Sequence, residues 1–225
     1  MDIGHKKIKL FIFDLDGTLL NTLGDLCFCG NYILAKHGFP THSSDAYRYF
    51  VGNGIMKLVE RILPENERVP SFMNQVYKEF MDFYQQHKMD TTAPYDGIVP
   101  LLDELAACGI MSAVASNKAH EAMDELMCHY FPHTTFSAVL GKRPNVPPKP
   151  APDIVFDILS MSQVQASEAL YIGDTAVDME TARRAGVRKI GALWGFRTKE
   201  ELMAAGADFL AASPAEVLDI VRRFC

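Results

Sequence analysis

Two carboxylates stand at the end of the first strongly apolar run of the chain, in the stretch "FIFDLDGTLL" at residues 11–20. Asp14 and Asp16 are two positions apart, and side chains with this spacing on a strand point to the same face. Asp16 followed by Gly17 is also common turn chemistry, but a turn does not explain Asp14. Paired carboxylates bind hard cations, and one can act as a nucleophile while the other transfers protons. We therefore interpret Asp14 and Asp16 as catalytic and metal-binding candidates.

A second acidic stretch, "YIGDTAVDMETARRAG", repeats this arrangement later in the chain. Asp174 follows an apolar strand pattern, and Asp178 falls in the first turn of the predicted next helix, where the helix dipole also favours an acid. If Asp14, Asp16 and Asp174 meet, their like charges require a cation between them. Oxygen ligands without histidine favour Mg²⁺ over zinc, so the pattern predicts a magnesium site.

Two further stretches have the chemistry of an anion site. Ser116 and Asn117 in "ASNKAH" are predicted to end a strand and begin a helix over Lys118–His129, so that a hydroxyl and helix N–H groups face an anion. The same residue types are also preferred N-caps. Lys149 in "PPKPAPD" is flanked by prolines, which restrict the backbone and hold one ammonium in place. A lysine binds phosphate as a point charge, and here it would supply local positive charge in an acidic chain.

Composition limits the classes of protein to be considered. The 225 residues carry a net charge of −6, which argues against a nucleic-acid partner because such surfaces are clustered and basic. No apolar stretch approaches a membrane span, and the apolar run after the basic first residues is too short for a signal peptide. Five cysteines, an odd number without metal-type spacing, predict reduced thiols and a cytoplasmic location.

Apolar runs that alternate with helical patterns must position these residues. Runs apolar on both faces are typical of a parallel sheet covered on each side, so we predict a doubly wound α/β fold. The predicted strands are Ile8–Asp14, Ile110–Ser116, Phe136–Leu140, Ala169–Asp174 and Val187–Leu193. Residues 22–95 show helical spacing instead. One stripe there, which we interpret as core packing, consists of Phe72, Met73, Val76, Tyr77, Phe80 and Tyr84. We expect a core of residues 1–21 and 96–225 and a helical insertion over 22–95.

The inserted helices carry a candidate substrate-binding loop, "VGNGIMK". Gly52, Asn53 and Gly54 can present backbone N–H groups to a small anion, with Arg48 or Lys57 nearby. A simple joint between two helices explains the two glycines equally well. The set of substrate-binding candidates is Arg48, Gly52, Asn53, Gly54, Lys57 and Asn117.

Taken in order, "DLDGTL", Ser116, Lys149 and "GDTAVD" resemble the four motifs of the haloacid dehalogenase-like hydrolase superfamily. The resemblance covers the whole chain and implies a Rossmann-like core with a helical cap inserted after the first motif. Stretches such as "YFVGNGIMKLVERIL", "WGFRTKEEL" and "GADFL" are most similar to the phosphoglycolate phosphatase branch. The implied activity is magnesium-dependent hydrolysis of a small phosphorylated metabolite, with 2-phosphoglycolate the leading candidate. We expect a monomer or a homodimer, without a membrane or nucleic-acid partner.

The resemblance also implies roles for individual residues. Asp14 is implied to take the phosphoryl group as an aspartyl-phosphate. Asp16 is implied to protonate the leaving oxygen and then to activate water, while its backbone carbonyl helps to hold magnesium. Ser116 and Lys149 are implied to bind the phosphoryl oxygens. Closure of the cap is expected to exclude water from the site.

The remaining implied ligands and the alternatives concern the metal and the substrate. The implied metal-site residues are Asp14, Asp16, Asp174 and Asp178, the last of which supports Asp174 and Lys149. Asn21 and Thr22 replace an acid and a small hydroxyl residue that are common in the phosphoglycolate branch, which leaves pyrophosphate, a nucleotide or a sugar phosphate open as substrates. A sugar-phosphate mutase would carry a histidine shortly after the first motif, and this chain has none there. A non-catalytic phosphate-ester binding protein would not need the complete set of acids, hydroxyl and lysine.

Overall fold

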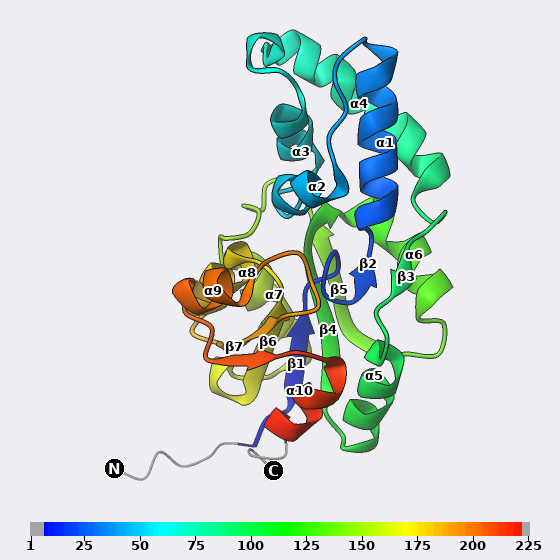
Figure 1. Cartoon of the computed structure of the whole chain (residues 1–225). Helices are drawn as coiled ribbons and strands as arrows, with labels where there is room; N and C mark the ends of the chain where they lie inside the picture. The colour runs from blue at the N-terminus through cyan, green and yellow to red at the C-terminus, as the bar shows by residue number, and fades with distance from the viewer. Residues whose placement is uncertain (1–6, 222–225) are drawn as a thin grey trace. The chain divides into compact units, whose positions relative to one another are not determined.

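The computed structural model describes residues 7–221, the side chain at 221 excepted (Figure 1). Cys225, expected as a reduced thiol, lies outside the described residues. The chain divides into two compact units, one ending at Leu19 and resuming at Pro94, the other comprising Leu20–Ala93. No helix among the described residues is long and apolar enough to cross a membrane.

A six-stranded parallel sheet forms the first unit, in the order β5-β4-β1-β6-β7-β8. The strands are β1 (Leu10–Phe13), β4 (Met111–Ala119), β5 (Phe136–Lys142), β6 (Ala169–Gly173), β7 (Arg188–Ala192) and β8 (Phe209–Ala211). The five predicted strands are therefore present, and the predicted α/β class is confirmed. The edge strand β8 was not predicted, because three residues are too few to show a strand pattern.

Helices cover both faces of this sheet. They are α5 (Ile98–Ala107), α6 (Met123–Tyr130), α7 (Asp153–Ser162), α8 (Ala176–Ala185), α9 (Lys199–Ala204) and α10 (Pro214–Val221), with short 3-10 turns at His120–Ala122 and Ala166–Glu168. A further 3-10 turn, Glu65–Glu67, belongs to the helical unit. Leu10 and Ile12 of β1 pack in one buried cluster with residues of α7 and α8. Phe11 and Phe13 alternate to the other face and are also fully buried. On that face α5 packs against β4 and α10 (Figure 1).

The helix predicted over Lys118–His129 was wrong at its start. Strand β4 continues through Ala119, which pairs with Lys142 of β5, and α6 begins only at Met123. Residues 117 and 118 are buried in extended conformation because their polar side chains bond to distant parts of the chain. Ser116 and Asn117 therefore lie within a strand and do not form a helix N-terminus, so the helix N–H groups expected to face an anion are not available at this position.

The second unit is helical apart from a short pair of strands. It contains α1 (Leu23–Lys36), α2 (Ser44–Phe50), α3 (Ile55–Ile62) and α4 (Pro70–His87), and its ends pair as β2 (Leu20–Asn21) with β3 (Ala93–Pro94). The predicted stripe on α4 has Val76, Phe80 and Tyr84 buried, and α4 packs against α1 and α3. The small strand β3 was not expected in a segment interpreted as helical.

A buried carboxylate joins the two ends of this helical unit. Asp25, in the first turn of α1, is 1% exposed. It accepts hydrogen bonds from the backbone N–H and the hydroxyl of both Thr91 and Thr92. Four donors satisfy the carboxylate, so its burial does not leave an unpaired charge in the interior.

Candidate active site

Three buried carboxylates converge at the carboxyl ends of two neighbouring strands. Asp14 directly follows β1 and Asp174 directly follows β6, and these strands pair in parallel. Asp178 lies in the first turn of α8, which begins after Asp174. One carboxylate oxygen from each of the three residues lies within 4.8 Å of the others. This edge of an open α/β sheet is where ligands usually bind.

The ammonium of Lys149 lies among these acids. Lys149 Nζ is 2.9 Å from Asp14 Oδ1 and 2.7 Å from Asp178 Oδ1. It also donates to the carbonyl of Ala115 at 2.9 Å and to the phenol oxygen of Tyr171 at 3.0 Å. Burial pulls the pKa of Lys149 down, but Asp14 and Asp178 more than offset this and raise that pKa well above its ordinary value. Lys149 is therefore a charged, fixed group in the site.

Asn117 holds the backbone of Lys149 in place. Its amide donates to the carbonyl of Lys149 at 3.1 Å, and the N–H of Lys149 donates to its Oδ1 at 2.9 Å. The peptide bond between Lys149 and Pro150 is cis. Asn117 was predicted to bind substrate, but the structure turns its side chain to the protein backbone. Its position supports a role in placing Lys149.

Burial and mutual repulsion dominate the electrostatics of the acids. Burial and the charge of Asp178 raise the pKa of Asp14 well above its ordinary value, against the pull of Lys149. Burial and Asp178 likewise raise the pKa of Asp174 to about 7. Asp174 Oδ2 accepts from the backbone N–H of Phe196 at 2.7 Å, which works in the opposite direction. The three carboxylates therefore carry more negative charge than the ammonium of Lys149 can neutralise.

The donor set fits a divalent cation. Three buried carboxylates face one ammonium, so their full ionisation leaves an excess of negative charge in the interior. Carboxylate oxygens are the ligands that magnesium prefers, and the group contains no histidine or cysteine. Asp14 Oδ1 accepts from the backbone N–H of Leu15 at 2.7 Å and contacts Lys149. Within residues 7–221 no hydrogen-bond donor reaches Asp14 Oδ2.

Asp178 is held from both of its oxygens. Oδ1 contacts Lys149 and accepts from Tyr171 at 3.2 Å, while Oδ2 accepts from the N–H of Thr175 at 3.1 Å and from its hydroxyl at 2.6 Å. Thr175 and Asp178 form a capping box at the start of α8. Gly173 has to be glycine, because a Cβ there would overlap the side chain of Asp178. Asp178 therefore positions the ammonium, as well as belonging to the acidic cluster.

Gly17 permits a close approach beside Asp174. Its φ of +87° lies in the left-handed region, and a Cβ on it would overlap the Asp174 carboxylate. Thr18 follows and donates from Oγ1 to Asp174 Oδ1 at 3.3 Å, while its carbonyl accepts from Trp194 Nε1 at 3.0 Å. The turn after β1 is thus packed directly against the turn after β6.

The side chain of Asp16 lies outside the acidic cluster. Its carboxylate pairs with Lys118, whose Nζ is 3.2 Å from Oδ1, and its side chain is 17% exposed. Lys118 itself is buried. Ser116, also buried, accepts at Oγ from the N–H of Lys118 at 3.1 Å. The structure thus brings Asp14, Lys149, Asp174 and Asp178 together by side chain, and directs Asp16 to a neighbouring ion pair.

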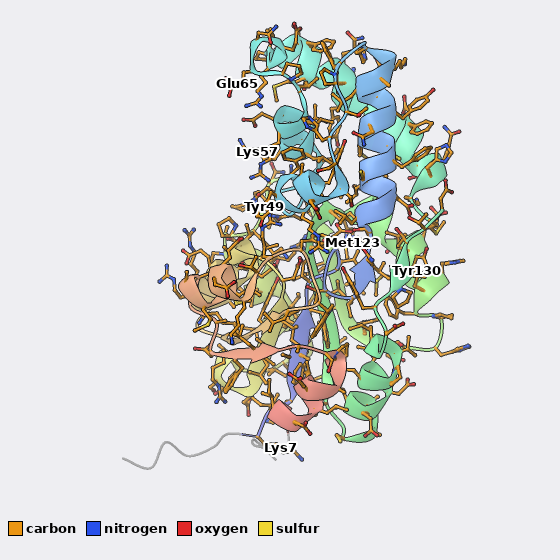
Figure 2. All side chains as sticks on the ribbon, in the orientation of Figure 1. Lys7, Tyr49, Lys57, Glu65, Met123 and Tyr130 are labelled. Carbon is orange, nitrogen blue, oxygen red and sulfur yellow. The ribbon has the colours of Figure 1, made fainter. Side chains whose placement is uncertain are left out.

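The predicted substrate-binding residues of the helical unit lie in α2, in α3 and in the loop between them. Gly52 and Gly54 have positive φ angles of 116° and 83°. Asn53 Oδ1 accepts from Arg61 at 2.8 Å, and Arg61 also donates to the carbonyl of Phe50 at 2.8 Å. Arg48 approaches Asp45 at 3.9 Å, and Lys57, which is labelled in Figure 2, pairs with Glu60 at 2.6 Å. Substrate binding by Arg48, Gly52, Asn53, Gly54 and Lys57 stays a prediction.

Sequence reasoning missed two polar side chains in the core unit. Lys118 was assigned to a helix, although it directly follows Ser116 and Asn117 and could have been included with them. Tyr171 was read as part of an apolar strand. Its position two residues before Gly173, and hence on the same strand face, was a signal that its hydroxyl points towards the residues after the strand.

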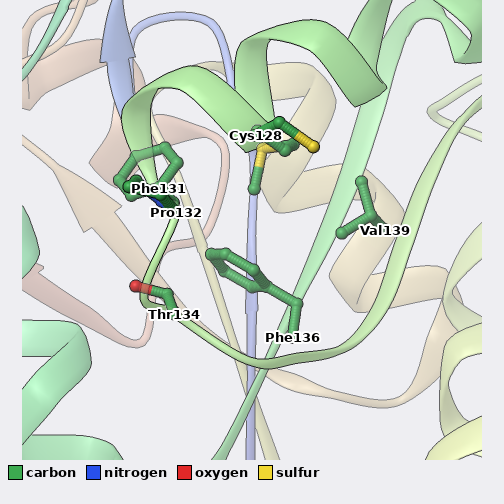
Figure 3. A pocket seen from close by; sticks show the side chains of 7 residues that line it. Cys128, Phe131, Pro132, Thr134, Phe136 and Val139 are labelled. Atoms are coloured by element: carbon green, nitrogen blue, oxygen red, sulfur yellow. The ribbon is translucent and has the colours of Figure 1, made fainter.

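A cavity of about 380 Å³ beside α6 and β5 is separate from this cluster (Figure 3). Its lining residues are Met127, Cys128, Phe131, Pro132, Thr134, Phe136 and Val139. None of the predicted catalytic or metal-binding residues is among them. The lining lacks charged groups, so this cavity does not have the chemistry of a phosphate site.

Comparison with known proteins shows which sequences this chain resembles. The profile of the haloacid dehalogenase-like hydrolases matches residues 11–192. A phosphoglycolate phosphatase from Vibrio parahaemolyticus serotype O3:K6 is 32% identical over 222 residues, which cover 96% of this chain and 97% of the relative. A phosphoglycolate phosphatase from Pseudomonas syringae pv. tomato is 29% identical, covering 97% of this chain and 79% of the relative.

A solved structure extends this likeness to the fold. The crystal structure of a candidate phosphoglycolate phosphatase from Lactobacillus delbrueckii subsp. bulgaricus superimposes with a TM-score of 0.90 at 29% identity, covering 96% of this chain and 98% of the other. A likeness over nearly the whole length includes both the parallel sheet and the helical unit. The chain therefore belongs to the haloacid dehalogenase-like hydrolases and, within them, to the phosphoglycolate phosphatase-like branch.

Proposed function

We propose that this phosphatase transfers the phosphoryl group of a small phosphorylated metabolite to Asp14 and then hydrolyses the aspartyl-phosphate. One observation carries the proposal: Asp14 is a buried carboxylate with one oxygen held by Lys149 and Leu15 and the other without a donor among the described residues. An oxygen without a hydrogen-bond donor retains its nucleophilic lone pairs. A fixed ammonium beside it can neutralise the charge of an arriving phosphoryl group.

The proposed reaction has two displacements at phosphorus. Asp14 Oδ2 forms the new O–P bond while the bond from phosphorus to the ester oxygen breaks, and the departing oxygen takes a proton from Asp16. A water molecule then attacks phosphorus, gives a proton to Asp16, and the bond from phosphorus to Asp14 breaks. Splitting the hydrolysis into two steps replaces one difficult barrier by two lower ones.

The surrounding residues bind and orient in this proposal. Lys149 and Ser116 bind the non-bridging phosphoryl oxygens, and Asn117 keeps the backbone of Lys149 in register. Asp14, Asp174 and the backbone carbonyl of Asp16 would hold Mg²⁺, with Asp178 beside them. When bound, the ion supplies positive charge that favours ionised carboxylates and stabilises charge on the phosphoryl oxygens.

Asp16 favours a phosphatase over a dehalogenase. An alkoxide leaving group needs a proton, whereas a halide does not, so a carboxylate at this position is useful only for the ester. The side chain is partly exposed, which lets water and a leaving group reach it. Its pairing with Lys118 keeps the carboxylate from moving freely, which supports a defined role.

We propose 2-phosphoglycolate as the substrate because relatives along the whole chain carry the name phosphoglycolate phosphatase. The helical unit is proposed as a cap whose loop at Gly52–Gly54, with Arg48 and Lys57, binds the carboxylate end of the substrate. Pyrophosphate, a nucleotide or a sugar phosphate remain the alternatives. We further propose a cytoplasmic monomer or homodimer; the thiols of Cys27, Cys29, Cys108 and Cys128 are unpaired with one another, in keeping with a reducing compartment.

Release of phosphate from a panel of metabolites, with magnesium and with chelator, tests the proposal. The expected result is release that needs magnesium and is fastest with 2-phosphoglycolate. A faster rate with pyrophosphate or a sugar phosphate would change the substrate and leave the chemistry standing. Absence of release from every ester, in a protein that still binds orthophosphate, would identify a binding protein instead.

A further inference from the structure

Tyr171 places a buried hydroxyl in the centre of the site, and the reaction proposed above gives it no role. The residue lies on β6 and is completely buried. Its phenol oxygen is 3.0 Å from Lys149 Nζ, 3.2 Å from Asp178 Oδ1 and 3.4 Å from the carbonyl oxygen of Ala115. Asp178 Oδ1 and the carbonyl oxygen of Ala115 also accept hydrogen bonds from Lys149 Nζ. The phenol and the ammonium therefore share the same pair of acceptors.

The number of acceptors around Lys149 exceeds the number of its protons. An ammonium has three N–H donors. Four acceptors lie within 3.0 Å of Nζ: Asp14 Oδ1, Asp178 Oδ1, the Ala115 carbonyl and the Tyr171 hydroxyl. If the ammonium turns one N–H to a phosphoryl oxygen, a further acceptor in the protein loses its donor. An unsatisfied acceptor is costly in a buried site.

Tyr171 differs from the other three acceptors because it carries a proton of its own. Its hydroxyl lies within reach of both Asp178 and the Ala115 carbonyl. When the ammonium turns away, the phenol can donate to whichever of these the ammonium has released. Asp178 Oδ1 and the carbonyl of Ala115 then each have a hydrogen-bond donor both before and after the phosphoryl group arrives.

We propose that Tyr171 is a positioning residue that takes over an acceptor of Lys149 and so frees one N–H of the ammonium for the phosphoryl group. The inference rests on the proposed function, in which Lys149 binds the phosphoryl oxygens. Tyr171 does not touch substrate. Its effect is exerted through Lys149, on the affinity for a phosphoryl group and on the rate of transfer.

Tyr171→Phe tests the proposal, with Tyr47→Phe as the matched control. Tyr47 is equally buried, lies in the helical unit, and donates to Asn31 Oδ1 at 3.1 Å. Both variants lose one buried hydroxyl, so both are expected to unfold at lower urea concentration. Only Tyr171→Phe is expected to lower kcat/KM and the affinity for orthophosphate measured by titration calorimetry, each by on the order of 10-fold. Values within about twofold of wild type for both quantities would overturn the proposal, since they would leave the hydroxyl with a structural role only.

A measurement on the unmodified protein keeps the test independent of folding of the variant. In a crystal structure of the magnesium-loaded protein with orthophosphate, Lys149 Nζ is expected to contact a phosphate oxygen. The distance from the Tyr171 hydroxyl to the carbonyl of Ala115 or to Asp178 Oδ1 is expected to shorten from the present 3.4 or 3.2 Å. An unchanged Tyr171 hydroxyl, with phosphate bound to Lys149, would refute the inference. The orthophosphate measurements do not need turnover, so a protein that hydrolyses no ester disproves the proposed function separately.

Discussion

Removal of the ammonium at position 149 should destabilise the protein in a way that depends strongly on pH. In Lys149→Met the side chain stays long and unbranched, ends short of the Nζ position and loses its charge. The wild-type ammonium lies 2.9 and 2.7 Å from two carboxylates, and the three side chains are 1%, 9% and 0% exposed. At these distances each pair has roughly 6 kcal/mol of attraction at an effective dielectric constant of about 20. Much of this offsets desolvation, so breaking the group by removing one partner should cost about 3–5 kcal/mol.

The pH dependence follows from the acids that remain. Without Lys149 the pKa of Asp14 rises further, because burial and Asp178 already raise it and Lys149 is the group that lowers it. The carboxyl of Asp14 therefore takes up a proton at higher pH in the folded variant than in folded wild type, and this protonation relieves the repulsion among the acids. The penalty is present in full near pH 8 and decreases as the pH falls, by at most about 1.4 kcal/mol per unit for each carboxyl.

Urea unfolding in the presence of EDTA at about pH 8 and about pH 5.5 measures this penalty. The single tryptophan, Trp194, hydrogen-bonds to Thr18 beside the site and provides a fluorescence signal for this unit. The double variant Lys149→Met with Asp14→Asn removes one negative charge together with the positive one. It should be more stable than Lys149→Met alone near pH 8, by about 1 kcal/mol or more. A penalty of equal size at both pH values, unchanged in the double variant, would show that the ammonium does not stabilise the site electrostatically.

Three other changes give separate checks. Asp14→Asn should lower phosphate release by roughly three orders of magnitude or more, because an amide of the same shape is a poor nucleophile, and activity near wild type would exclude Asp14 as the attacking residue. Asp25→Ala removes the acceptor of four hydrogen bonds from Thr91 and Thr92. Urea titrations should show a free energy of unfolding lowered by about 2–4 kcal/mol. A loss below about 0.5 kcal/mol would mean that these hydrogen bonds do not stabilise the helical unit. The pKa of Asp174 is raised from an ordinary 3.8 to about 7 in the folded state. Between pH 3.8 and about pH 7 the folded protein therefore keeps a proton on Asp174 that the unfolded protein has lost. The free energy of unfolding in EDTA should accordingly fall as the pH rises through this window. Added magnesium should raise the calorimetric melting temperature more above this window than within it, and a shift independent of pH would contradict the assignment of Asp174 as a ligand.

The sequence was sufficient for the sheet and for the strand ends because these depend on local pattern. Runs apolar on both faces predicted parallel strands, and the sheet of the structure contains each of them. The placement of Asp14 and Asp174 at one edge follows from the same pattern, since the carboxyl ends of parallel strands meet there. The family motifs could likewise be recognised by order and residue type, and the comparisons confirm the family.

The partners of the site residues were not predictable from local pattern. Asp16 pairs with Lys118, which lies 102 positions along the chain, and Lys149 contacts Tyr171 and Ala115, which are 22 and 34 positions away. The strand through Ala119 displaced a helix that the residue types favoured, because pairing with β5 and two buried polar side chains outweighed helix propensity.

Sequence alone thus determined which residue types stand at the ends of which strands, since side-chain alternation and helix periodicity are properties of short segments. Tertiary structure alone decided that Asp16 pairs with Lys118, that Asn117 binds backbone and that a phenol completes the ammonium's surroundings. These contacts depend on strand register and on the burial of charge, and both are fixed only when distant segments pack together.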